Sequence, residues 1–407
     1  MKRQSGALLA LVLAAGAGLA GAAPEEDQPG KASGYLVGET ARASPLSGQV
    51  SISGIQMNVL APSETPMALR RAASEPDFRW GIDQARRLTV DDYLARQRIM
   101  GLLIIKDGEI QVERYQYDRQ PSQRFLSNSI AKSITSLAIG LALREGKIAS
   151  LDDTAERYAP KLAGTLYGST TIRNLLRMAA GVRFTENYDG KDDLARFNAE
   201  VASHGVESAA RLVTERETEP GTHFSYASAQ TEILAAVLRD ATGMTLSEYL
   251  TPRLWQPIGA ESSALWRIDA TGLERASGNF HATLRDYGRL GVVLANDGVR
   301  PEDPEYRPII PRDYLLDATD WHRFDKPFLP GKATRYYGYG YQFWVFPGEK
   351  RRFALLGVYG QMIFIDPQLK LVMVQTAANA TAKAGDTTLA RDADAFWRGV
   401  VRQYGSW

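Results

Sequence analysis

The feature that most constrains the fold is a change of hydrophobic period along the chain. Residues 101–115 form two apolar or alternating runs around Asp107-Gly108, the strongest short-range signal of a β-hairpin. Near the other end, the apolar runs 362–365 and 371–374 flank a turn-forming segment. Between the two ends, apolar residues recur at helical spacing. We therefore predict an α+β fold, in which both chain ends build one antiparallel sheet flanked by helices.

The middle of the chain, about residues 146–330, is predicted to be a mainly helical inserted region. Thr89 followed by Asp91 and Asp92 is typical of a helix N-terminus. Further helices are expected over 129–146, 171–181, 232–243 and 392–401, the first three ended by glycines. Further strands are expected near 55–59 and over 339–345 and 353–356.

The N-terminal segment has the pattern of a secretory signal. Lys2 and Arg3 precede an apolar run over 7–21, and small residues at 20–22 offer a cleavage site. We predict a signal peptide over 1–22, a linker over 23–75 and one folded domain over 76–407. An uncleaved membrane anchor is the alternative, although the run is shorter than the roughly 20 residues that a spanning helix needs. In a bacterium the signal predicts a periplasmic or secreted protein with no membrane span after cleavage.

Composition excludes several classes of function. The chain contains no cysteine, which excludes thiolate nucleophiles, cysteine-ligated zinc and disulfides. The four histidines form no metal-binding pattern, so we expect no metal and no cofactor, and we interpret His223 and His281 as polar loop residues. The formal net charge is +1 and the folded part has no run of basic residues, which argues against a nucleic-acid partner. A small-molecule substrate is expected instead.

Ser129 is the candidate nucleophile, in the one Ser-x-x-Lys of the chain. A serine hydroxyl needs a base, and Lys132 would lie on the same face of a helix, three residues on. A desolvated lysine has a lowered pKa and can act as that base. The helix N-terminus would favour the negative charge that develops during attack. The alternative is an N-cap serine with a surface lysine.

Tyr226 is the candidate for a second proton-transfer group. Tyr-x-Ser occurs at Tyr167, Tyr226 and Tyr404, so the triplet alone does not select among them. Residues 219–226 have the composition of a turn that runs into a helix, which would present Tyr226 at a helix entrance. The alternative is an aromatic residue that only caps the helix.

The segment 357–361 is the candidate for a backbone oxyanion hole. Gly357 and Gly360 lie between apolar strands, where glycines allow a close approach of the backbone to a ligand. The N–H groups of Gln361 and Ser129 could hold the oxyanion of a tetrahedral intermediate. A β-bulge is the alternative.

Together these residues resemble the class C β-lactamase and serine esterase superfamily, most closely the branch of 6-aminohexanoate-dimer hydrolases. The resemblance runs from about Leu88 to the C-terminus, with its motifs in the expected order: residues 129–136, 171–181, 220–228, 285–291 and 357–361. It implies a β-lactamase-like fold and a catalytic role for Tyr226. It also implies substrate binding by Ser228, Tyr188 and Gly360.

Two departures narrow the expected substrate. Ser228 stands where class C β-lactamases have asparagine, and Val358-Tyr359-Gly360 stands where they have Lys-Thr-Gly. The missing lysine removes the cation that would bind a β-lactam carboxylate, so we predict cleavage of an ester or linear amide. A β-lactamase or DD-peptidase, or a catalytically silent penicillin-binding-like domain, remains the alternative. An α/β-hydrolase is disfavoured because the chain has no Gly-x-Ser-x-Gly. The oligomeric state is not readable from the sequence.

Overall fold

The structure is a computed structural model that describes residues 56–82, 87–303, 305, 307–379, 382 and 388–407. The predicted signal peptide and most of the predicted linker lie outside the described residues. No helix in the described part of the chain combines the length and the apolar character needed to cross a membrane.

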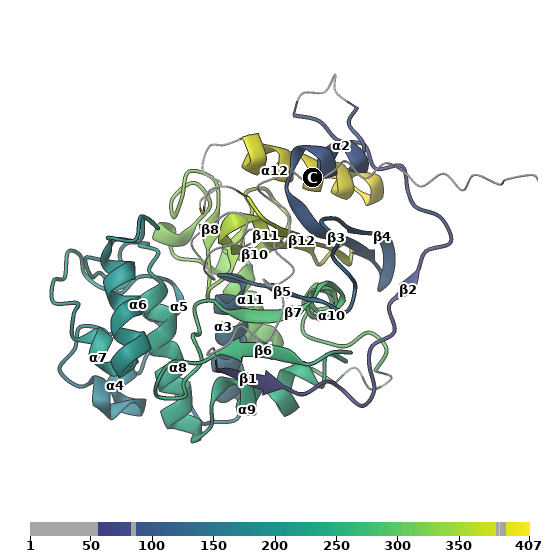
Figure 1. The fold of residues 1–407 in the computed structure, drawn as a ribbon. Helices are drawn as coiled ribbons and strands as arrows, with labels where there is room; N and C mark the ends of the chain where they lie inside the picture. The colour runs from purple at the N-terminus through teal and green to yellow at the C-terminus, as the bar shows by residue number, and fades with distance from the viewer. Residues whose placement is uncertain (1–55, 83–86, 304, 306, 380–381, 383–387) are drawn as a thin grey trace, which may run out of the picture.

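An eight-stranded sheet is assembled from the two ends of the chain (Figure 1). N-terminal strand β3 pairs antiparallel with C-terminal strand β12, from Leu371 opposite Lys106 to Ala377 opposite Ile99. This pairing confirms the predicted α+β architecture. The strand order is β2 (Arg70–Arg71), β4 (Glu109–Tyr115), β3 (Ile99–Lys106), β12 (Leu371–Ala377), β11 (Gln361–Asp366), β10 (Phe353–Gly357), β9 (Trp344–Val345) and β8 (Gly338–Tyr339).

The hairpin predicted around Asp107-Gly108 is confirmed. Lys106 pairs with Glu109, so the loop is the two-residue turn itself. Asp107 has φ 51° and Gly108 has φ 80°, the positive values that a type I′ turn requires at both positions. This turn matches the twist of the two strands and sets their register.

A second sheet of four strands lies beside the first, and two of its strands fall inside the region predicted to be mainly helical. Its order is β1 (Met57–Leu60), β6 (Ala264–Arg267), β7 (Phe280–Thr283) and β5 (Arg124–Leu126). Both of these strands, β6 and β7, have four residues. So short a segment does not show a clear apolar/polar alternation between longer stretches with helical spacing. His281 lies buried in β7, so its interpretation as a loop residue was wrong.

Helices cover both faces of the large sheet and form a group at one side (Figure 1). α2 and α12 pack on one face, while α3 and α10 pack on the other, where the larger apolar core lies. The helices are α2 (Val90–Arg96), α3 (Ile130–Arg144), α4 (Ala155–Tyr158), α5 (Ile172–Leu176), α6 (Asp193–His204), α7 (Val206–Ala210), α8 (Ser228–Thr242), α9 (Leu246–Leu250), α10 (Leu284–Ala295), α11 (Arg312–Thr319) and α12 (Thr388–Tyr404).

Most helix ends follow the local signals. Thr89 caps α2 in a reciprocal capping box with Asp92, and Gly243 ends α8 in the left-handed conformation. α5 differs, because it stops at Leu176 rather than near Gly181. The side chain of Gln342, far away in the sequence, donates to the carbonyls of the last two residues of α5 and so satisfies its C-terminus early.

The strand predicted over 339–345 is instead two short strands, β8 and β9, joined by a turn. Gln342 has φ 63° within that turn. A Cβ atom on Gly340 would lie 2.0 Å from the carbonyl oxygen of Ala318, so only glycine allows the chain to pass there. The alternating pattern is real, but close packing against α11 breaks the strand.

Candidate active site

Ser129 lies at the N-terminus of α3, directly before its first turn. It is the N-cap residue, and its side chain makes no capping hydrogen bond, so the hydroxyl is left for other contacts. Lys132, one turn further, is almost fully buried at 2% exposure and donates a hydrogen bond from Nζ to Ser129 Oγ at 2.9 Å. The structure thus brings the two residues of the motif into direct contact, and the lysine is not on the surface.

Burial lowers the pKa of Lys132 to about 8, and the carboxylates of Glu186 and Glu232 oppose this effect. Desolvation disfavours the ammonium form, since a buried charge loses its hydration. The amine nitrogen also donates to the carbonyl oxygen of Ser277 at 2.7 Å. Lys132 therefore loses its proton more readily than an ordinary lysine, and its amine has two hydrogen-bond partners.

Tyr226 lies two residues before the start of α8 and close to the Ser129–Lys132 pair. Lys132 Nζ is 5.2 Å from the centroid of the Tyr226 ring. Desolvation and the Glu186 carboxylate raise the pKa of Tyr226, while a hydrogen bond with Ser129 lowers it, and the net direction is upward. Tyr226 is therefore a neutral phenol at neutral pH, suited to donate a proton rather than to start as phenolate.

Aromatic side chains hold the Tyr226 ring from one side. It stacks on Trp344 with a centroid distance of 5.6 Å and an interplanar angle of 25°, and it meets Tyr339 edge-on at 6.2 Å. Both partners come from the β8–β9 hairpin. The break in the predicted strand over 339–345 thus supplies the surface against which Tyr226 rests.

The segment 357–361 lies against the N-terminus of α3. A Cβ on Gly357 would come within 2.4 Å of the Ser127 carbonyl oxygen, and Asn128 Nδ2 donates to the Val358 carbonyl at 3.0 Å. Gln361 starts β11 opposite Gly357. Within the part of the chain that the structure describes, no backbone carbonyl accepts the N–H of Ser129. The two groups expected to form the oxyanion hole therefore lie in one corner of the fold.

The segment itself is the hairpin turn between β10 and β11, formed by Val358–Gly360, and it is neither a bulge nor an edge. Tyr359 and Gly360 have φ values of 64° and 89°. A Cβ on Gly360 would lie 2.7 Å from Asn379 Nδ2, so this glycine is needed for packing against Asn379. The buried Gln361 side chain is hydrogen-bonded in both directions to the backbone of Ala377.

Ser228 and Tyr188 are brought together by Glu186, which the sequence analysis did not single out. The Glu186 carboxylate accepts the Ser228 N–H at 2.6 Å, the Ser228 hydroxyl at 2.8 Å and the Tyr188 hydroxyl at 2.6 Å. Glu186 also acts electrostatically on Lys132 and Tyr226. No local pattern marks it, because its partner Ser228 is 42 residues away.

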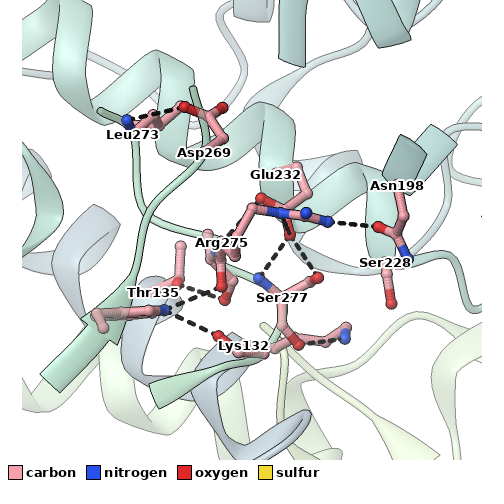
Figure 2. A network of polar contacts seen from close by, with 12 residues as sticks. Lys132, Thr135, Asn198, Ser228, Glu232, Asp269, Leu273, Arg275 and Ser277 are labelled. Atoms are coloured by element: carbon pink, nitrogen blue, oxygen red, sulfur yellow. Dashed lines mark hydrogen bonds and ion pairs between the residues drawn. The ribbon is translucent and has the colours of Figure 1, made fainter. Parts of the chain in front are cut away.

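Glu232 and Ser277 are two further residues that the sequence analysis missed. Ser277 accepts a hydrogen bond from Lys132 and donates one to Glu232, and Figure 2 shows all three in one polar network. Glu232 directly precedes the apolar run 233–238 of α8, and an acid beside such a run is a signal that could have pointed to it. The described residues contain no cluster of three or more histidine and acidic side chains arranged to hold a metal ion.

The chain is similar in sequence to known hydrolases. The 6-aminohexanoate-dimer hydrolase of Paenarthrobacter ureafaciens is 28% identical over 316 residues, which cover 75% of this chain and 79% of that protein. A D-aminopeptidase of Brucella anthropi is 28% identical over 148 residues, which cover 36% of this chain and 27% of that protein.

Solved structures share the fold. A Bacillus anthracis protein assigned as a 6-aminohexanoate-dimer hydrolase superposes with a TM-score of 0.78 at 24% identity, covering 91% of this chain and 96% of that one. The hydrolase EstCE1 superposes with a TM-score of 0.57 at 18% identity, covering 75% of this chain and 96% of that one. The sequence model of the Beta-lactamase family matches residues 87–395, well over half of the chain. The chain therefore belongs to the beta-lactamase family.

Proposed function

We propose that this protein is an exported serine hydrolase that cleaves an ester or a linear amide through an acyl-enzyme on Ser129. The observation that carries the proposal is the 2.9 Å contact between Lys132 Nζ and Ser129 Oγ, made by a lysine whose pKa is lowered to about 8. A base with a pKa near the working pH combines a useful neutral fraction with sufficient basicity. Export rests on the signal pattern over residues 1–22.

The mechanism assigns a role to each group. Neutral Lys132 takes the proton of the Ser129 hydroxyl as Oγ attacks the substrate carbonyl carbon. The N–H groups of Ser129 and Gln361 hold the resulting oxyanion. When the tetrahedral intermediate collapses, the Tyr226 hydroxyl protonates the leaving alcohol or amine, and the Lys132 ammonium returns a proton to Tyr226. The proton lost by Ser129 thus ends on the leaving group.

Deacylation runs the same relay in reverse. The Tyr226–Lys132 pair accepts a proton from a water molecule as the water oxygen attacks the acyl carbon. Ser129 Oγ then leaves the acyl carbon and recovers a proton from the same pair. Because the groups are coupled, the titration of the pair, rather than of either residue alone, sets the pH dependence.

The substrate class follows from what lies beside Ser129. Val358 stands where a lysine would bind a β-lactam carboxylate. The Glu186 carboxylate, close enough to act on Lys132, also disfavours an anionic substrate. The relatives named above include a 6-aminohexanoate-dimer hydrolase and a D-aminopeptidase. These observations support a neutral or amine-bearing ester or amide over a β-lactam.

Fluorophosphonate labelling of the purified chain tests the proposal. Wild type should be labelled on the peptide that contains Ser129, and Ser129→Ala should not be labelled. Ser133→Ala, which removes the buried hydroxyl that donates to the Gln342 carbonyl at 2.6 Å, is the matched control and should label like wild type. Turnover of p-nitrophenyl esters or anilides without nitrocefin cleavage would support the substrate class. An unlabelled wild type, or a labelled Ser129→Ala, would contradict the proposal.

A further inference from the structure

A turn of the chain at residues 275–278 contacts the amine of Lys132. The Ser277 carbonyl accepts a hydrogen bond from Lys132 Nζ, across 145 residues of sequence. The turn is also bonded to α3 itself, because Thr135 Oγ1 donates to the Ala276 carbonyl at 3.1 Å. The position of the lysine amine therefore depends on the position of this turn.

Glu232 of α8 holds the same turn through three hydrogen bonds. Its carboxylate accepts the N–H of Ala276 at 3.1 Å, the N–H of Ser277 at 3.0 Å and the hydroxyl of Ser277 at 2.5 Å (Figure 2). Glu232 is only 1% exposed, and its nearest cation, Arg275, is 3.9 Å away. Arg275 in turn donates to Asn198.

The buried carboxylate of Glu232 is unfavourable for folding. A buried charge is unfavourable for folding unless close partners compensate it, and the Arg275 contact is long. The carboxylate nevertheless suits its surroundings, since all three contacts on the turn are donors and it offers only acceptors. It also faces Lys132 from α8, while Glu186 and the Tyr226 phenol face the amine from the segments before α6 and α8.

We infer that Glu232 is a positioning residue for the reaction, which holds the Ser277 carbonyl so that the Lys132 amine is directed at Ser129. A neutral amine has two N–H donors and one lone pair. When one N–H is bound by a fixed carbonyl, the rotation of the amine is restricted and its lone pair can face the serine hydroxyl. This inference rests on the proposed function, but concerns a residue that touches neither substrate nor Ser129.

The test compares Glu232→Gln with a matched control, Glu274→Gln. Glu274 is equally buried at 1% exposure. It also accepts three hydrogen bonds, from Leu246 N, Ser247 N and Asn58 Nδ2. It directly precedes the 275–278 turn in the chain, but none of these three bonds goes to that turn or to Lys132. The amide keeps the volume in both variants and removes the charge and one acceptor. The rate of fluorophosphonate labelling and the kinetics on p-nitrophenyl butyrate are measured from pH 5 to 10 on the full chain.

We expect Glu232→Gln to lower the plateau labelling rate on the order of 10- to 100-fold, the usual scale for a misplaced catalytic group. The loss should appear in kcat, with KM within about twofold, because the residue does not contact substrate. The acid limb of the profile should move to lower pH, since Glu232 raises the pKa of Lys132. Glu274→Gln should lose stability but keep the wild-type profile.

Ser277→Ala keeps the inference testable if Glu232→Gln does not fold. It removes one of the three hydrogen bonds and leaves the backbone in place. We expect a labelling rate reduced by more than threefold, at unchanged KM. A rate within twofold of wild type in the folded variant, or an equal loss in Glu274→Gln, overturns the positioning role while Ser129 remains the nucleophile. A wild type that takes no label overturns the proposed function itself.

Discussion

Replacement of Lys132 by methionine should separate the cost of this lysine for folding from its use in catalysis. The side chain is 2% exposed and its pKa falls from 10.5 to about 8. Because the folded-state value is the lower one, the unfolded chain binds more protons between about pH 8 and 10.5. In that pH window the stability of the wild type rises with pH. Below about pH 8 the burial of the charged lysine destabilises the fold to its full extent.

The size of the penalty follows from the shift. A shift of roughly 2.5 pKa units corresponds to about 3 kcal/mol at pH 7. Methionine fills a similar volume but leaves the Ser277 carbonyl without its donor, which costs about 1–3 kcal/mol. Lys132→Met should therefore be as stable as wild type at pH 7, or more stable by up to about 2 kcal/mol.

Urea unfolding of both proteins at pH 7 and pH 10 measures this difference. At pH 10 Lys132 is mostly neutral in the folded wild type, so its burial destabilises the fold much less. The free energy of unfolding of the variant relative to wild type should therefore fall by about 2–3 kcal/mol between pH 7 and pH 10. Labelling of Ser129 should fall about 10³-fold or more at both pH values. A variant that is markedly less stable at pH 7, or a stability difference that does not change with pH, would refute the account of a desolvated lysine.

Two further changes address the other groups at the site. Tyr226→Phe should lower turnover about 10²- to 10⁴-fold while the melting temperature stays close to wild type, because the ring still stacks on Trp344; turnover within tenfold of wild type would argue against leaving-group protonation by Tyr226. Gly357→Ala should slow labelling at least tenfold, because its Cβ would lie 2.4 Å from the Ser127 carbonyl and push β10 away from the N-terminus of α3. Gly108→Ala strains the β3–β4 turn, where Gly108 has φ 80°, and is the control for a strained backbone elsewhere in the fold. Unaltered labelling of Gly357→Ala would contradict the proposed oxyanion hole.

Much of the fold is visible in short stretches of sequence. The Asp107-Gly108 turn, the Thr89 capping box and the Gly243 helix end each depend on a few neighbouring residues, and each is found where the pattern predicts it. The contact between Ser129 and Lys132 is of the same kind, because a three-residue spacing on a helix places both side chains on one face.

Only the tertiary structure decided what surrounds that pair. Whether Lys132 is a surface residue or a desolvated amine depends on Ser277, which comes from another part of the chain. Glu186 meets Ser228, and Gly357 meets Ser127, for the same reason: buried donors, acceptors and close backbone contacts must find partners, and these partners lie far apart in sequence. Local periodicity determines which face of an element is buried, but it carries no information about which distant polar group will lie opposite. The Ser129–Lys132 contact could therefore be predicted from the sequence, whereas the polar network around Lys132 became visible only in the folded chain.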